Sequence, residues 1–163
     1  MKKNIDVFTG EVKMADADSM LVSHAIGSCI LVAAYYQKRN IGAMAHIMLP
    51  GKASEKNKMN KFRYAEDAIH ELLLLLNVPE ESYQEIKICL VGAGNVLKRQ
   101  DDAICRDNIH SVRKILNDKG LKIAAKALGG INRRSIKFDI AKAEVYFTEN
   151  GSKDILLWKD ESE

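Results

Sequence analysis

The chain has 163 residues, 47% of them apolar, so it is about as long as one compact domain and can bury a core without disulfide or metal cross-links. We therefore expect a single domain over residues 1–163. Lysine and arginine total 25 against 22 acidic residues, and a formal charge of only +3 excludes the concentrated positive surface of a nucleic-acid-binding protein. The partner should be a protein or a small molecule.

The sequence also predicts a cytoplasmic protein that is not inserted into a membrane. Residues 2–6 turn acidic after one apolar residue, so the apolar core of a secretory signal is absent. The longest apolar stretches, residues 41–50 and 72–76, are far shorter than the roughly 20 residues that span a bilayer. The three cysteines include no CxxC pair, which predicts free thiols, no disulfide framework and no zinc site.

The first third of the chain predicts a hairpin of two buried strands. Residues 22–36 are nearly all apolar, and Val, Ile and Tyr become frequent toward their end, which favours a strand buried on both faces. Residues 38–40 form a predicted turn. Residues 41–49 are again apolar except for His46, and Pro50 ends this strand because proline cannot donate to a strand ladder.

Two amphipathic helices are predicted next. Residues 51–61 are polar and should form a mobile surface loop. From Tyr64 to Asn77 the apolar period is helical, and a second helix is predicted over residues 102–119, ended by Gly120. The apolar stripe of the first helix consists of Ala65, Ala68, Ile69, Leu72, Leu73 and Leu76.

The other segments are typical of short strands. Residues 86–91 form one strand, followed by a tight turn at residues 92–95. Beyond this turn, Leu97 stands where a dinucleotide-binding fingerprint needs its third glycine. Four more strands are predicted, at residues 121–128, 135–140, 143–148 and 155–158. Because the connections between them are short, we expect these four strands to pair antiparallel. The expected fold is α+β with mostly antiparallel or mixed strands and two main helices rather than a doubly wound parallel sheet.

Cys29 and His46 are the chemically distinctive residues of the predicted hairpin. If the turn pairs Gln37 with Asn40, His46 faces Leu31 across the two strands. Cys29 and His46 are then diagonal neighbours on one sheet face, at the usual spacing of roughly 7–8 Å. A loop longer or shorter by one residue would place them on opposite faces.

A thiol beside an imidazole can attack an amide carbonyl, because the imidazole favours the thiolate. Gly27 and Ser28 precede the cysteine, and the backbone amides of this segment are candidates for an oxyanion hole. The alternative interpretation is that Cys29 is a small core residue and His46 a hydrogen-bonded core histidine. The occurrence of both residues at this spacing favours the catalytic interpretation.

Several segments resemble, in order and spacing, the chemoreceptor glutamine deamidases of bacterial chemotaxis, the CheD family. They are Ile26-Gly27-Ser28-Cys29, the run from Gly42 through His46 to Pro50, Tyr64-Ala65, Gly129-Gly130 and Arg134-Ser135. The resemblance implies that Cys29 is the nucleophile and His46 its base. It also implies that Ser23 occupies the position of the third member of the family's triad, a threonine.

The activity implied by this resemblance is that of a protein-glutamine glutaminase without cofactor or metal. Cys29 attacks the carboxamide of a glutamine in a methyl-accepting chemotaxis receptor, ammonia leaves with a proton from His46, and water hydrolyses the thioester to glutamate. The resemblance further implies a CheC-type phosphatase as partner. The implied fold is a layered α/β sandwich like the catalytic domain of cytotoxic necrotizing factor toxins.

Some positions depart from the family pattern. Ser23 keeps the hydroxyl of the family's threonine and loses the methyl group, so a role in orienting His46 stays open. Cys105 interrupts the family's Ile-Gly-x-Arg-Asn segment, and Ala127 lies where an acidic residue is common before the Gly-Gly turn. These departures bear on substrate preference and rate more than on the nucleophile.

Alternatives remain open for both the function and the base. The chain could be a non-catalytic module that binds receptors or the phosphatase, and methyl-ester hydrolysis would use the same thioester. His24 could replace His46 as the base, although strand alternation points it away from the face of Ser23. Cys105, near a helix start, is a second candidate for a thiol with a lowered pKa.

Overall fold

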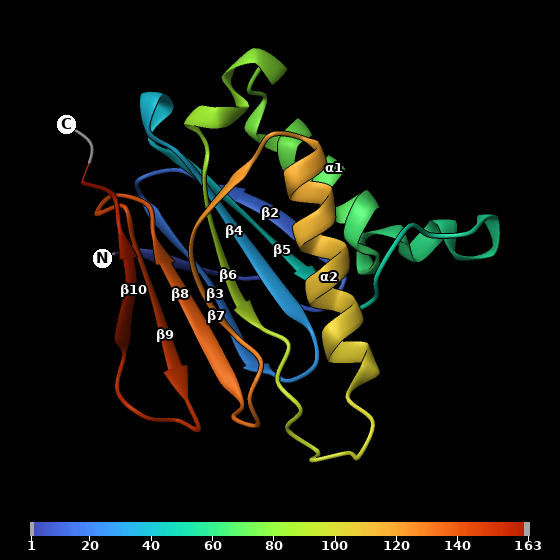
Figure 1. Cartoon of the computed structure of the whole chain (residues 1–163). Coiled ribbons are helices and arrows are strands. Elements are labelled where there is room, and N and C mark those ends of the chain that lie inside the picture. The colour runs from blue at the N-terminus through green and yellow to red at the C-terminus, as the bar shows by residue number, and fades with distance from the viewer. Residues whose placement is uncertain (1, 162–163) are drawn as a thin grey trace.

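The computed structural model describes residues 2–161 and consists of two packed five-stranded sheets with helices on one side (Figure 1). The first sheet has the order β1 (Lys3–Asp6), β3 (Ser19–Ile26), β8 (Arg134–Asp139), β9 (Glu144–Glu149) and β10 (Ile155–Lys159). The second has the order β2 (Val12–Ala15), β5 (Ile41–Ile47), β4 (Ile30–Tyr36), β6 (Lys87–Gly92) and β7 (Lys122–Leu128). The helices are α1 (Ala65–Leu76) and α2 (Ala103–Asp118), with 3-10 segments at Gln37–Arg39, Glu55–Arg63 and Glu80–Glu85.

The second sheet is the middle layer and is buried on both faces. The helices α1 and α2 cover one face, and the strands β8, β9 and β10 lie on the opposite side (Figure 1). Successive residues of β4 enter the two cores in turn, since Val32 packs toward the helices and Leu31 toward the first sheet. Every residue of β4 and β5 is therefore buried, which confirms the predicted burial of both faces for residues 30–36.

The hairpin of β4 and β5 has the predicted register. Leu31 lies opposite His46, and Ile30 lies opposite Ile47. Asn40 closes the connection in the left-handed region, with a φ of 50°. The helix α1 is also as predicted, because its six buried residues are the six of the apolar stripe and Asn77 ends it.

Residues 22–36 are not one strand, contrary to the prediction. The strand β3 ends at Ile26 in the first sheet, and β4 begins at Ile30 in the second. The break coincides with a bulge in β3, where Ala25 has a φ of 56° and the pairing with β8 shifts. Both strands are apolar, so the hydropathy pattern did not reveal that the chain changes sheets at residues 27–29.

The pairing of β7 was also predicted incorrectly. It lies parallel to β6, because the helix α2 connects the two strands as a crossover. The antiparallel pairing is confirmed for the meander of β8, β9 and β10. The strands β1 and β2 were not predicted, and the expected loop at 51–61 contains 3-10 turns. The fold is therefore α+β with two mixed sheets.

No helix within residues 2–161 has the length and apolarity required to cross a membrane.

Candidate active site

Cys29, His46 and Ser23 meet at one end of the interface between the two sheets. They line a common cavity of about 310 Å³, to which Thr9 also contributes. Cys29 lies in the segment that crosses from β3 to β4, His46 in β5 and Ser23 in β3. The strand β5 belongs to the second sheet and β3 to the first, so the packing of the sheets brings His46 and Ser23 together.

The segment Gly27–Cys29 is held by its three consecutive carbonyl groups. The Gly27 oxygen accepts a hydrogen bond from the Gly94 N–H at 2.9 Å, and the Cys29 oxygen accepts one from the Ala93 N–H at 2.7 Å. The Ser28 oxygen accepts one from Asn108 Nδ2 at 3.0 Å. Among residues 2–161, the N–H groups of Ser28 and Cys29 have no acceptor.

Gly92 allows the end of β6 to approach this segment closely. Its φ is 123°, and an added Cβ would lie 2.4 Å from the Cys29 oxygen. The buried Arg134 binds the same end of β6. Its Nη1 donates to the Gly92 oxygen at 3.2 Å and to the Gly129 oxygen at 2.8 Å. Its guanidinium also pairs with Glu149 at 3.2 Å. The Gly129-Gly130 and Arg134-Ser135 segments therefore help to hold the end of β6 against the segment Gly27–Cys29.

The hydrogen bonds of His46 determine its tautomer. Its Nδ1 lies 3.1 Å from Ser23 Oγ and 3.1 Å from the Val7 carbonyl oxygen. The Ser23 hydroxyl donates to the same carbonyl at 2.7 Å. Because a carbonyl only accepts and the Ser23 proton is already used, Nδ1 must carry the ring proton. The Nε2 atom is therefore the basic nitrogen, and it lies 3.4 Å from Thr9 Oγ1.

Burial keeps the thiol and the imidazole neutral. Desolvation raises the pKa of Cys29, and a hydrogen bond from Thr9 offsets part of this effect. Desolvation lowers the pKa of His46, although the Val7 carbonyl and the charge of Glu11 act in the opposite direction. The resting pair at neutral pH is thus a thiol and a neutral imidazole rather than the expected activated thiolate. Such a pair can attack a carbonyl by general-base catalysis.

Comparisons with known proteins identify the family. Residues 48–149 match the family described as CheD chemotactic sensory transduction. The probable chemoreceptor glutamine deamidase CheD of Chlorobium luteolum is 31% identical over 155 residues, which are 95% of this chain and 77% of that protein. The chain belongs to the CheD family.

Two further members of the CheD family match over nearly their whole length. The chemoreceptor glutamine deamidase CheD of Thermotoga maritima is 28% identical over 160 residues, covering 98% of this chain and 99% of the relative. The corresponding protein of Halalkalibacterium halodurans is 29% identical over 157 residues, covering 89% of this chain and 97% of the relative.

Of the other sequence candidates, His24 also lines the cavity of Cys29, whereas Cys89 and Cys105 do not. His24 is 64% exposed, and its Nε2 lies 3.9 Å from an Asp6 carboxylate oxygen, on the face of β3 opposite to Ser23. Burial raises the pKa of Cys89 to about 12, as expected for a core residue. Burial and the charge of Asp102 also raise the pKa of Cys105, so the helix start does not lower it as proposed from the sequence.

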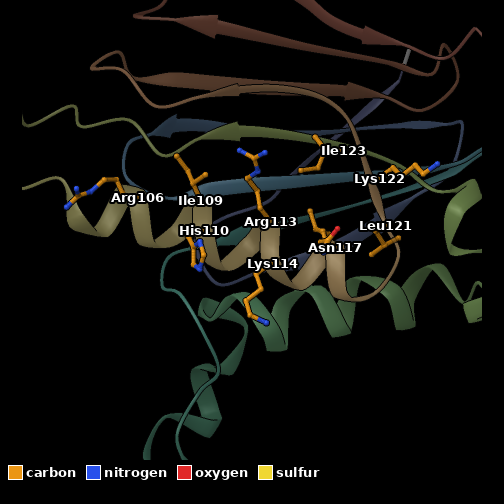
Figure 2. A pocket seen from close by; sticks show the side chains of 10 residues that line it. Arg106, Ile109, His110, Arg113, Lys114, Asn117, Leu121, Lys122 and Ile123 are labelled. Carbon is orange, nitrogen blue, oxygen red and sulfur yellow. The ribbon is translucent and has the colours of Figure 1, made fainter.

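Several larger hollows lie beside the site or away from it. One of about 510 Å³ includes Cys29, Leu97 and Arg133 in its lining. Another of about 830 Å³ lies along α2 and the start of β7, where Arg113 and Lys122 project from the two elements (Figure 2). None of the residues that line this second hollow belongs to the candidate site, and its open, basic wall holds no nucleophile.

Sequence reasoning missed three groups that build the site. Val7 acts through its carbonyl oxygen, so its side chain gives no signal, and Thr9 lies in a loop whose position the sequence does not show. Asn108 did give a signal, because it lies on the buried stripe of α2 among apolar residues. Its amide also donates to the Met48 oxygen at 3.1 Å, so it links the nucleophile segment to the end of the His46 strand.

Asn108→Ala should make the segment Gly27–Cys29 more mobile. The Ser28 and Met48 carbonyls would lose their donor, so we expect the free energy of unfolding to fall by about 1–3 kcal/mol. A looser segment exposes the thiol, so Cys29 should react faster with iodoacetamide. Urea denaturation and peptide-resolved alkylation measure the two effects. The matched control is Asn117→Ala, an exposed position of the same helix; equal behaviour of both variants would rule out the link.

Proposed function

We propose that the chain is a chemoreceptor glutamine deamidase in which Cys29 is the nucleophile, His46 the general base and Ser23 an orienting residue. One observation carries the assignment: Nδ1 of His46 is held by acceptors, which leaves Nε2 as a base in the cavity that contains the Cys29 thiol. The names of the relatives supply the substrate, the chemoreceptor.

The reaction begins from the neutral pair. As the Cys29 sulfur attacks the side-chain carbon of the glutamine amide, Nε2 of His46 accepts the thiol proton. The oxygen of the tetrahedral intermediate becomes anionic, and the N–H groups of Ser28 and Cys29, which have no acceptor among residues 2–161, are its proposed donors. Ammonia then leaves with the proton from His46. A water molecule, deprotonated by His46, hydrolyses the thioester and releases glutamate.

The finer expectations from the sequence stay part of the proposal. The substrates are methyl-accepting receptors, a CheC-type phosphatase is the partner, and residues 1–163 are one cytoplasmic domain. Two packed sheets covered by helices support a fold of the cytotoxic necrotizing factor type. The raised pKa of Cys29 is the observation that suits the alternative, a binding module with a slow thiol. Hydrolysis of receptor methyl esters would proceed through the same thioester.

Cys29→Ala should abolish conversion of glutamine to glutamate in receptor fragments, because no other group in the cavity can form the thioester. Mass spectrometry of the fragments detects the gain of about 1 Da per deamidated residue, which follows from exchanging NH₂ for OH. Cys105→Ala, which also removes one thiol, is the control and should convert the fragments at the wild-type rate. Conversion by Cys29→Ala at that rate would refute the assignment of the nucleophile.

The pH dependence of kcat/KM should reflect a neutral pair. The base must be unprotonated, so activity rises with pH through the pKa of His46, which burial places below 6.5. Activity then falls only above pH 9.0, where Cys29 loses the proton that ammonia needs to leave. Steady-state rates between about pH 5 and 10 test both limbs, which follow the free-enzyme pKa values. An alkaline fall near neutral pH would indicate a thiolate–imidazolium pair instead.

Ser23→Ala should slow the enzyme only moderately. The Val7 carbonyl still accepts the Nδ1 proton of His46, so the tautomer is kept while one of the two contacts that orient the ring is lost. We expect kcat to fall by about 3- to 10-fold, or about 0.7–1.4 kcal/mol in the activation free energy. Ser23→Thr keeps the hydroxyl and is the matched comparison. A loss of 1,000-fold in Ser23→Ala, on the order of 4 kcal/mol, would show that Val7 alone cannot orient the ring.

A further inference from the structure

Ala25 is common to the linings of three hollows at the surface. Two of them also include Cys29, the cavity of about 310 Å³ and the hollow of about 510 Å³. The third has a volume of about 530 Å³ and shares Ala25, Val96 and Arg133 with the second. A substrate whose glutamine reaches Cys29 therefore has two adjoining hollows for the residues that flank that glutamine.

A bulge in β3 forms the wall that the three hollows share. The φ of Ala25 is 56°, and the pairing of β3 with β8 shifts between Ser23 and Ile26. Bulges of this kind are frequent beside active sites, because they interrupt the strand ladder and redirect the side chains. The backbone at Ala25 is thus irregular where the flanking residues of a substrate would lie.

Arg133 is, among residues 2–161, the one charged residue that lines both of the flanking hollows. Its N–H donates to Asn150 Oδ1 at 3.2 Å, and its oxygen accepts a hydrogen bond from the Asn150 N–H at 2.8 Å. The Asn150 side chain also donates to Asn132 Oδ1 at 3.0 Å. The main chain of Arg133 is therefore held in place, whereas its side chain is exposed.

The guanidinium of Arg133 has no carboxylate partner and no hydrogen-bond acceptor within the part of the chain that the structure describes. Glu149, on the strand paired with β8, does not provide one. Its carboxylate already pairs with Arg134 at 3.2 Å and accepts a hydrogen bond from Asn132 Nδ2 at 3.1 Å. The charge of Arg133 is thus available to a group from outside the chain.

The carboxylates that line the flanking hollows are paired with other groups. The lining of the 530 Å³ hollow includes no carboxylate. In the 510 Å³ hollow, Asp101 and Asp102 both pair with Arg106, at 3.8 and 3.2 Å. Asp101 Oδ1 also accepts a hydrogen bond from the Ala103 N–H at 2.9 Å. An anionic group in either hollow would therefore meet the unpaired guanidinium of Arg133.

We infer that Arg133 is a specificity residue that selects target glutamines with an acidic residue nearby in the receptor sequence. A guanidinium can bind a carboxylate through two parallel N–H···O hydrogen bonds. An acidic side chain beside the glutamine gains this pairing, whereas a basic side chain meets a like charge. The inference rests on the proposed function, because it describes how the same site chooses among glutamines.

The test uses a receptor fragment with one target glutamine and compares Glu, Ala and Lys at single neighbouring positions. Positions up to about four residues on either side are tested, a reach of at most about 14 Å in an extended chain. With wild type, kcat/KM from ammonia release should be about 3- to 10-fold higher for the best Glu fragment than for its Ala counterpart. The Lys fragment should be poorer than both, and about 0.5 M NaCl should reduce these differences.

Three variants show whether Arg133 causes the preference. Arg133→Gln removes the charge, so the ratio of kcat/KM between the Glu and Ala fragments should fall to about 1. Arg133→Glu should reverse the preference and favour the Lys fragment over the Glu fragment. The matched control is Arg113→Gln, an exposed arginine of α2 that lines neither hollow, and it should keep the wild-type ratio. Because the hydrogen bonds of Arg133 are made by its main chain, its variants should fold.

A wild-type ratio in Arg133→Gln would overturn the inference and leave the deamidase assignment intact. The same holds if wild type converts the Glu and Ala fragments equally well at every position, or if Arg113→Gln loses the preference to the same degree. A wild-type protein that converts none of the fragments would instead refute the proposed function.

Discussion

The site depends on the hydrogen bonds that three consecutive carbonyl groups accept, those of Gly27, Ser28 and Cys29. A segment that leaves one sheet and enters another has no strand partner for its own backbone, so its polar groups need acceptors and donors from elsewhere. Here the N–H groups of Ala93 and Gly94, directly after β6, and the amide of the buried Asn108 donate to the three carbonyls. Cys29 of this segment lines the cavity that His46 and Ser23 also line.

Some of the segments that resemble the CheD family are distant in the sequence but belong to one hydrogen-bonded network. Gly92 permits the approach, Arg134 holds the Gly92 and Gly129 carbonyls, and Glu149 neutralises the buried guanidinium. The removal of one partner from such a network leaves a polar group or a charge buried without compensation. The motif around the Gly-Gly turn is therefore structural support for the segment that carries Cys29, although it lies outside the cavity that contains His46.

The sequence was sufficient where local chemistry determines geometry. The turn at Asn40 fixed the register of the hairpin, and the period of α1 identified its buried stripe. The sequence was insufficient where packing between segments distant in the sequence determines the structure. The break at Ala25 is hidden within an apolar run, and the parallel pairing of β7 depends on how α2 packs. Ser23 could be compared with a family threonine, but the Val7 carbonyl that shares its role has no side-chain signal.

The neutral state of the Cys29 and His46 pair has a consequence for chemical durability. Peroxide and other oxidants attack thiolates, and a cysteine progresses toward sulfinic acid in proportion to its thiolate character and its exposure. Because burial raises the pKa of Cys29, the thiol keeps its proton at neutral pH. The fold thus leaves little thiolate at Cys29 for adventitious oxidation.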